Sequence, residues 1–179
     1  FESETEVFGY PLYATVDKFN RIQVTPNAEL MSKTAFVQLM PVKDFYKARN
    51  KTGLGNDFNF WIPMYINKDH FNLAKNNILV MLDAMLPAGS KKNSSEYDVI
   101  KSADILFNIL NKSIVSLLKG TWLQSVATIE AYCQYYLLLI NLIKLYPEIQ
   151  EHINKQVKNM LSSNKARNKQ NLGDMGEFV

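Results

Sequence analysis

The 179-residue sequence contains few of the residues from which disulfides and metal sites are built. Cys133 is the single cysteine, so no disulfide can form within the chain, and this favours a reducing compartment. The two histidines, His70 and His152, have no cysteine, histidine or aspartate three or four residues away, the spacing of a helical metal motif. We therefore interpret both histidines as polar residues near helix starts.

Catalytic motifs are also missing from the sequence. Cys133 lies in a strongly apolar segment, which predicts a buried thiol of low reactivity. Gly53-Leu54-Gly55 is not followed by the residues of a phosphate-binding loop, and the acidic residues are too scattered to nominate a carboxylate pair for acid–base catalysis. We predict a protein without enzymatic activity, without a cofactor and without a metal.

No apolar run is long enough to cross a bilayer. The longest, between Glu130 and Lys144, has 13 residues, whereas a helical span needs roughly 20. The first residues, Phe1 to Glu6, are acidic and do not have the layout of a signal peptide. We expect an intracellular protein, cytoplasmic or nuclear, with no transmembrane segment.

The composition that remains is that of an ordinary globular protein, 47% hydrophobic and 21% charged, with a net charge of +3. The length suits one domain, and we expect residues 1–179 to form a single one. Phe1 is not a start methionine, and an apolar run begins at Phe178-Val179. From these two observations we expect the chain to be a fragment of a longer protein.

The N-terminal part predicts a β-hairpin over residues 7–24, because Val7 to Val16 alternates and is rich in aromatic and β-branched residues. Pro11 predicts that its first strand lies at a sheet edge. A helix of about three turns is predicted after Pro26-Asn27. The stretch from Pro41 to Asp57 is predicted to be a mobile basic loop. Phe58 to Ile66 is interpreted as a short strand or an extended segment that plugs the core.

Four further helices are predicted by apolar spacings of three and four: Phe71 to Leu86 with Asn67 as its cap, Asp98 to Lys119, Thr121 to about Tyr146, and a last helix opened by Pro147. The predicted inner positions are Phe71, Ala74, Ile78, Met81, Leu82 and Met85 in the first, Val99, Ala103, Leu106, Phe107, Leu110, Ile114, Leu117 and Leu118 in the second, and Ile149, Ile153, Val157, Met160 and Leu161 in the last. Tyr132 to Leu145 is apolar nearly all round, which predicts the buried centre of a bundle. The predicted fold is mainly α: a helical bundle over 27–161, a small N-terminal β-hairpin, and a basic tail with an apolar end over 162–179.

Two groups of residues are candidates for an interaction surface. The aromatic residues Trp61 and Tyr65 are of the kind found in binding hot spots, although core packing is the favoured interpretation. The basic residues fall in the Lys43–Lys51 loop and near the C-terminus: Lys47, Arg49, Lys165, Arg167 and Lys169. They indicate a nucleic-acid or acidic-lipid surface, or a solvated helix face and tail. We favour the second interpretation, because no aromatic residue able to stack on a base occurs from Gln150 to Glu177.

Five segments together carry a resemblance to a known type of module: Phe8-Gly9-Tyr10-Pro11-Leu12, Leu30-Met31-Ser32-Lys33-Thr34-Ala35-Phe36, Phe60-Trp61-Ile62-Pro63-Met64-Tyr65-Ile66-Asn67 with His70, Ile129-Glu130-Ala131-Tyr132-Cys133, and Leu172-Gly173-Asp174-Met175-Gly176-Glu177-Phe178. In this order they resemble a helical module of very large multidomain eukaryotic proteins, some of which carry ubiquitin-conjugating-type domains. The resemblance covers most of the chain. It implies a scaffold or recruitment piece of a larger ubiquitin-related protein, with no catalytic residue.

The predicted function is therefore a non-catalytic protein–protein interaction or scaffold module of a large intracellular protein. Its partner would be another protein or other domains of the same chain. The alternative is binding of nucleic acid or another acidic surface through the basic C-terminal segment and the Lys43–Lys51 loop.

Overall fold

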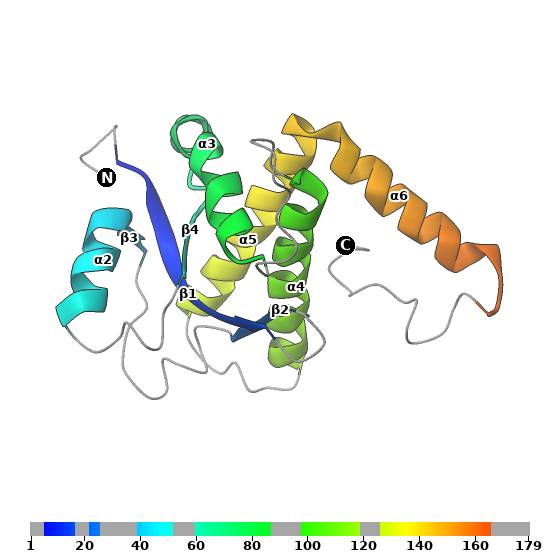
Figure 1. Cartoon of the computed structure of the whole chain (residues 1–179), viewed down its shortest axis with the longest axis horizontal. Helices are drawn as coiled ribbons and strands as arrows, with labels where there is room; N and C mark the ends of the chain where they lie inside the picture. The colour runs from blue at the N-terminus through cyan, green and yellow to red at the C-terminus, as the bar shows by residue number, and fades with distance from the viewer. Residues whose placement is uncertain are drawn as a thin grey trace.

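The structure, a computed structural model, describes residues 6–16, 22–25, 39–51, 60–86, 98–118 and 126–165, and these residues are mainly helical (Figure 1). The strands are β1 (Phe8–Val16), β2 (Ile22–Thr25), β3 (Met40–Pro41) and β4 (Phe60–Pro63). The helices are α2 (Val42–Lys51), α3 (Lys68–Ala84), α4 (Val99–Leu118), α5 (Val126–Leu145) and α6 (Pro147–Ser162). The predicted fold class, a helical bundle with a small N-terminal sheet, is confirmed.

β1 is the strand with which all the others pair. Its second half forms the predicted antiparallel hairpin with β2, in the register Tyr13↔Thr25 to Val16↔Ile22. Its first half pairs with β3 and with β4, both antiparallel. β1 is therefore a central strand, and the prediction of an edge strand was wrong. Pro11 is tolerated because β3 pairs only as far as Gly9, so Pro11 has a single register partner, Trp61, among the described residues.

The side chain of Trp61 holds β3 and β4 on either side of β1. Its indole Nε1 donates a hydrogen bond to the Met40 carbonyl oxygen at 3.1 Å, across β1. Gly9 makes this crossing feasible, because it stands opposite both Met40 and Pro63. A Cβ at Gly9 would lie 2.7 Å from Trp61 Cε2 and 2.2 Å from the Ile62 carbonyl oxygen. Glycine is therefore required by close packing at this position.

α2 occupies most of the segment that was predicted to be a mobile basic loop, and that prediction was wrong. The helix follows β3 without an intervening turn, and Phe45 anchors it in the core at 4% exposure. Asp44 lies in its first turn, where a negative charge interacts favourably with the helix dipole. α2 packs against β3 and β1, on the opposite side of the strands from α3, α4 and α5 in the view of Figure 1.

α3 begins as the sequence predicts. Asn67 is its N-cap, and the Asn67 side chain accepts a hydrogen bond from the His70 backbone N–H at 2.8 Å. Five of the six predicted inner positions, Phe71, Ala74, Ile78, Leu82 and Met85, are buried, and the sixth, Met81, is partly buried. α3 therefore packs a continuous apolar face against β4 and α4.

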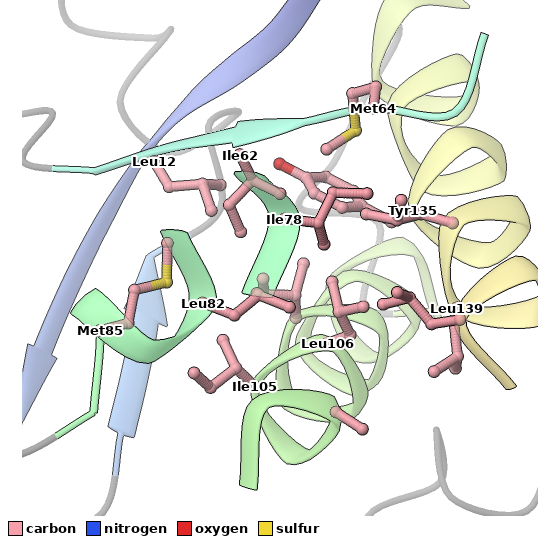
Figure 2. Packing of buried hydrophobic residues seen from close by; sticks show 14 of the residues in the cluster. Leu12, Ile62, Met64, Ile78, Leu82, Met85, Ile105, Leu106, Tyr135 and Leu139 are labelled. Atoms are coloured by element: carbon pink, nitrogen blue, oxygen red, sulfur yellow. The ribbon is translucent and has the colours of Figure 1, made fainter. Parts of the chain in front are cut away.

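α4, and not α5, is the central helix of the bundle. It packs against α3, α5, α6 and β2, and its buried residues extend over more than the predicted stripe: Ser102, Ala103, Ile105, Leu106, Phe107, Ile109 and Leu110. Figure 2 shows Ile105 and Leu106 of α4 meeting Leu82 of α3 and Leu139 of α5. α5 buries only one side, with Tyr135, Leu138, Leu139 and Leu142 turned inward. The prediction of α5 as the buried centre was wrong.

α6 begins at Pro147, as predicted, but only its first half is well packed. Ile149 is 1% exposed, whereas Leu161, a predicted inner residue, is 57% exposed. In Figure 1 the helix extends away from the bundle after its first turns. Residues 26–38, which include most of the predicted first helix, and residues 166–179 lie outside the described residues. Met40, at the end of that predicted helix, lies in β3.

Candidate interaction surface

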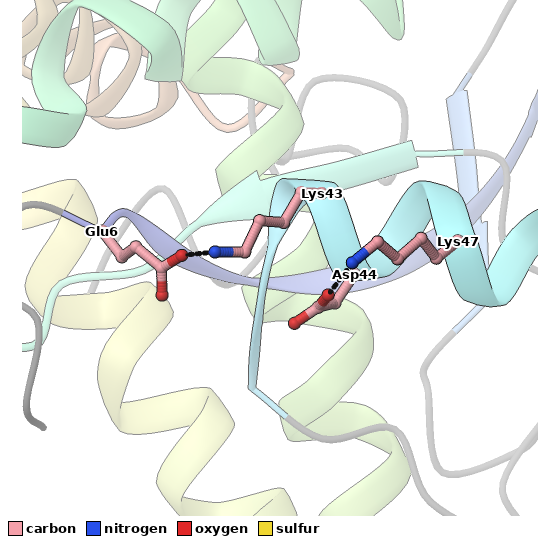
Figure 3. Close-up of polar contacts among 4 residues, drawn as sticks. All are labelled: Glu6, Lys43, Asp44 and Lys47. Atoms are coloured by element: carbon pink, nitrogen blue, oxygen red, sulfur yellow. Dashed lines mark hydrogen bonds and ion pairs between the residues drawn. The ribbon is translucent and has the colours of Figure 1, made fainter.

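Two basic residues of α2, Lys43 and Lys47, lie on the surface and are paired with carboxylates. Lys43 contacts Glu6, which precedes β1, and the Lys47 ammonium lies 3.4 Å from Asp44 one turn earlier (Figure 3). Both lysine side chains are more than half exposed, so each pair contributes little to stability. The backbone of Arg49 lies in α2. The positive charge of this helix is therefore balanced locally at Lys43 and Lys47.

The aromatic and C-terminal candidates are not brought together with α2 into one surface. Trp61 is 3% exposed, so it is a core residue, as the favoured interpretation predicted, and it is not available as a surface candidate. Tyr65 is half-buried and packs against that core. Lys165 is exposed just beyond the end of α6. Arg167 and Lys169 lie outside the described residues.

His70 has a structural role at the start of α3. Its Nε2 accepts a hydrogen bond from the Phe8 backbone N–H at 2.8 Å, which ties β1 to α3. Burial lowers the pKa of His70, an effect that the nearby Met64 backbone partly opposes. Its Nδ1 is buried and has no hydrogen bond of ordinary geometry to any described residue. His70 is therefore a neutral imidazole whose Nε2 acts as an acceptor. His152, on α6, faces Asp104 of α4 at 3.8 Å.

Two tyrosines share the interior between β1 and α5. The rings of Tyr10 and Tyr135 are 6.2 Å apart. Burial, and then the neighbouring Tyr10, raises the pKa of Tyr135 well above its ordinary value. Burial, and then the carboxylate of Glu130, raises the pKa of Tyr10. The Tyr135 hydroxyl has no hydrogen-bond partner within the described part of the chain, so it carries an uncompensated cost of burial.

The outer face of α5 is the surface that sequence reasoning missed. Cys133 is exposed on it, so the prediction of a buried thiol was wrong. Ile129, about one turn before Cys133, is 55% exposed, and Leu137, about one turn after Cys133, is 40% exposed. Leu145, at the end of the helix, is 41% exposed. An apolar residue exposed alone is common, so it is the row along one helix that makes this face the candidate contact surface.

We call the face that carries Ile129, Glu130, Cys133, Leu137 and Lys144 the α5 outer face. Leu145 lies about 80° around the helix from Leu137 and is not part of it. Its charged residues are Glu130 near the start and Lys144 near the end, both exposed. The sequence contains one indication of this face: Glu130, Leu137 and Lys144 are spaced seven residues apart, which places them on the same side of a helix. The apolar character of the whole helix concealed which side faces outward.

No group of three or more possible metal ligands occurs within the described ranges. None of the helices there is both long enough and apolar enough to span a membrane. A comparison of the chain with known protein families, with curated proteins and with solved structures finds no match in any of the three.

Proposed function

We propose that this chain is a protein–protein interaction module that binds through the α5 outer face. The observation that carries the proposal is the row of exposed apolar residues Ile129, Cys133 and Leu137 on a helix whose opposite side is built into the core. Burial of such a face against another helix is a common mode of protein recognition. The resemblance to a module of large ubiquitin-related proteins supports a scaffold role for the same surface.

The alternative, binding of nucleic acid, has less support. Phosphate recognition requires cations that are available to the ligand. Lys43 and Lys47 each lie against a carboxylate, and Trp61, an aromatic residue that could stack on a base, is buried. We therefore propose the protein partner alone.

Site-specific photocrosslinking in cells tests the proposal. Leu137 is replaced by the photoreactive residue benzoylphenylalanine, and the same residue is placed at Asn76, which is exposed on α3. We expect protein adducts from position 137 and none from position 76. The adducts should weaken when Ile129→Asp is added on the same face, and should persist when Leu73→Asp is added on α3, where Leu73 is 44% exposed.

Three outcomes would overturn the proposal: no adduct from position 137, adducts of equal yield from both positions, or adducts to nucleic acid. Circular dichroism of each purified variant shows whether the fold is retained. Because all four substituted positions are exposed, we expect stability to change by only about 0.5 kcal/mol.

A further inference from the structure

The α5 outer face carries a charge pattern that is complementary to itself. Glu130, Leu137 and Lys144 are exposed and follow one another at intervals of seven residues. Positions seven apart drift by only about 20° around a helix, so the three side chains lie nearly in a line. Leu137 stands midway between the negative and the positive residue. Reversing the direction of such a row places each charge opposite a charge of the other sign.

We propose that the partner of the α5 outer face is a second copy of this chain, with the two α5 helices packed antiparallel about a two-fold axis at Leu137. In this dimer Glu130 of each copy faces Lys144 of the other. An interface of this symmetry must complement itself, and the row meets that condition. The inference rests on the proposed function, because it names the partner of the same surface.

The charges select the antiparallel arrangement over the parallel one. A parallel pair would place Glu130 against Glu130 and Lys144 against Lys144, and both contacts are repulsive. Glu130 and Lys144 are the only charged residues in the sequence of α5, so no other charge on this helix offsets the repulsion. Charges that flank an apolar seam set the orientation of helix pairs in coiled coils for the same reason.

The position of Cys133 distinguishes the two arrangements. In the antiparallel dimer the two Cys133 residues lie four positions on either side of the axis, about 12 Å apart along the helices at 1.5 Å per residue. That separation exceeds the reach of a disulfide, whose Cα atoms lie within about 7 Å. In a parallel dimer the two thiols would be adjacent. Residue 137, on the two-fold axis, faces its own counterpart in either arrangement, so Cys133 is the position that distinguishes them.

Charge reversal tests the proposal on the purified 179-residue chain. One helix per copy is a small interface, so sedimentation velocity is measured up to about 100 µM protein. We expect the unmodified chain to dimerise and Glu130→Lys and Lys144→Glu each to weaken dimerisation by about tenfold or more. An equimolar mixture of the two variants should dimerise again, because one copy then carries two lysines and the other two glutamates. Lys155→Glu, at an exposed position of α6, is the matched control and should dimerise normally.

A disulfide crosslink tests the orientation. Leu137→Cys in a Cys133→Ser background should form a covalent dimer with oxidised glutathione, whereas the unmodified chain should not crosslink through Cys133. Crosslinking of the unmodified chain through Cys133 would establish a parallel pair and overturn the proposal, and the absence of a covalent dimer from Leu137→Cys would also overturn it. So would a monomeric unmodified chain, or a mixture of the charge variants that stays monomeric. If the chain is monomeric but position 137 crosslinks to another protein, the dimer fails and the proposed function stands.

Discussion

At the scale of single residues, Gly9 shows how little room the core leaves. The Trp61 indole and the Ile62 carbonyl lie against its Cα, as β4 crosses β1. We expect Gly9→Ala to lower the free energy of unfolding by about 1–3 kcal/mol, the usual cost of overpacking. Urea denaturation measures it, with Asn76→Ala on the exposed side of α3 as the control, for which a change under about 0.5 kcal/mol is expected. Equal effects of the two changes would show that β1 can move away from Trp61.

His70 makes the stability of the fold dependent on pH. Burial lowers its pKa below the ordinary value of 6.5, to which it returns on unfolding. At a pH between the folded and the unfolded pKa of His70, the unfolded chain binds more protons than the folded one. The contribution of neutral His70 to stability is therefore complete above pH 6.5 and declines as the pH falls below it. Protonation would also place a second donor against the Phe8 N–H.

The check is the free energy of unfolding from about pH 7.5 to about pH 5, the range in which histidine titrates. We expect the unmodified chain to lose stability across this range and His70→Gln to lose less of it. The matched variant His152→Gln retains His70, so its loss should resemble that of the unmodified chain. The same pH dependence in His70→Gln as in the unmodified chain would contradict the assignment.

Tyr135 has a buried hydroxyl group that makes no hydrogen bond to a described residue. Its ring fills the space between β1 and α5, while its oxygen is buried and has no partner among the described residues. We expect Tyr135→Phe to be as stable as the unmodified chain or more stable by about 1 kcal/mol, since an unsatisfied polar group is removed. Tyr135→Ala should cost about 3–5 kcal/mol through the cavity it creates. Thermal and urea denaturation compare the two, and a loss above about 1 kcal/mol in Tyr135→Phe would reveal a hydrogen bond.

At the scale of elements, α4 holds the bundle together, and Leu110 tests its role. Leu110 is 2% exposed on the stripe that the sequence predicts. We expect Leu110→Ala to lower the free energy of unfolding by about 2–5 kcal/mol, the range for a truncated core leucine. Val80→Ala on α3, where the side chain is 40% exposed, is the control and should cost under about 1 kcal/mol. A cost for Leu110→Ala as small as the control's would mean that α4 turns another face inward.

The elements differ in how far the sequence predicts them, and periodicity explains the difference. The Asn67 cap, the inner stripe of α3 and the stripe of α4 follow from the spacing of apolar residues. α5 is apolar all round, so periodicity cannot say which side faces outward. α2 was missed because Val42 and Phe45 give it too short an apolar pattern to distinguish from a loop.

The candidate surface was harder to predict than the fold, because it depends on contacts that are distant in sequence. Lys43 is neutralised by Glu6, which lies 37 positions earlier. Trp61 was one of two aromatic candidates, and its burial depends on β1 and β3 closing over β4. The seven-residue spacing of Glu130, Leu137 and Lys144 is visible in the sequence, but the exposure of these three side chains is not.

At the scale of the whole molecule, the bundle is unevenly packed, and α6 is embedded in it only near its start. Ile149, in the first turns, is 1% exposed and packs in the core, whereas Leu161 in the last turn is 57% exposed. We expect Ile149→Ala to cost about 2–5 kcal/mol and Leu161→Ala to cost less than about 0.5 kcal/mol. Chemical denaturation of both variants provides the comparison. Similar costs would indicate that the end of α6 packs in solution against a part of the chain outside the described residues.

The central place of β1 has a consequence for the order in which the chain folds. β1 is near the N-terminus, but its partners in β4 and the Met64 amide that bonds to the Phe8 carbonyl come about 50 positions later. Ribosomes add about 5–20 residues per second, so an apolar strand with open edges waits about 3–10 seconds for its partner. Among the described strands, β2 can pair with it over Tyr13 to Val16 during that interval, and β3 can pair at Phe8 and Gly9 once it has been made. The first half of β1 is thus an apolar segment of the newly made chain that a chaperone would protect until β4 is made.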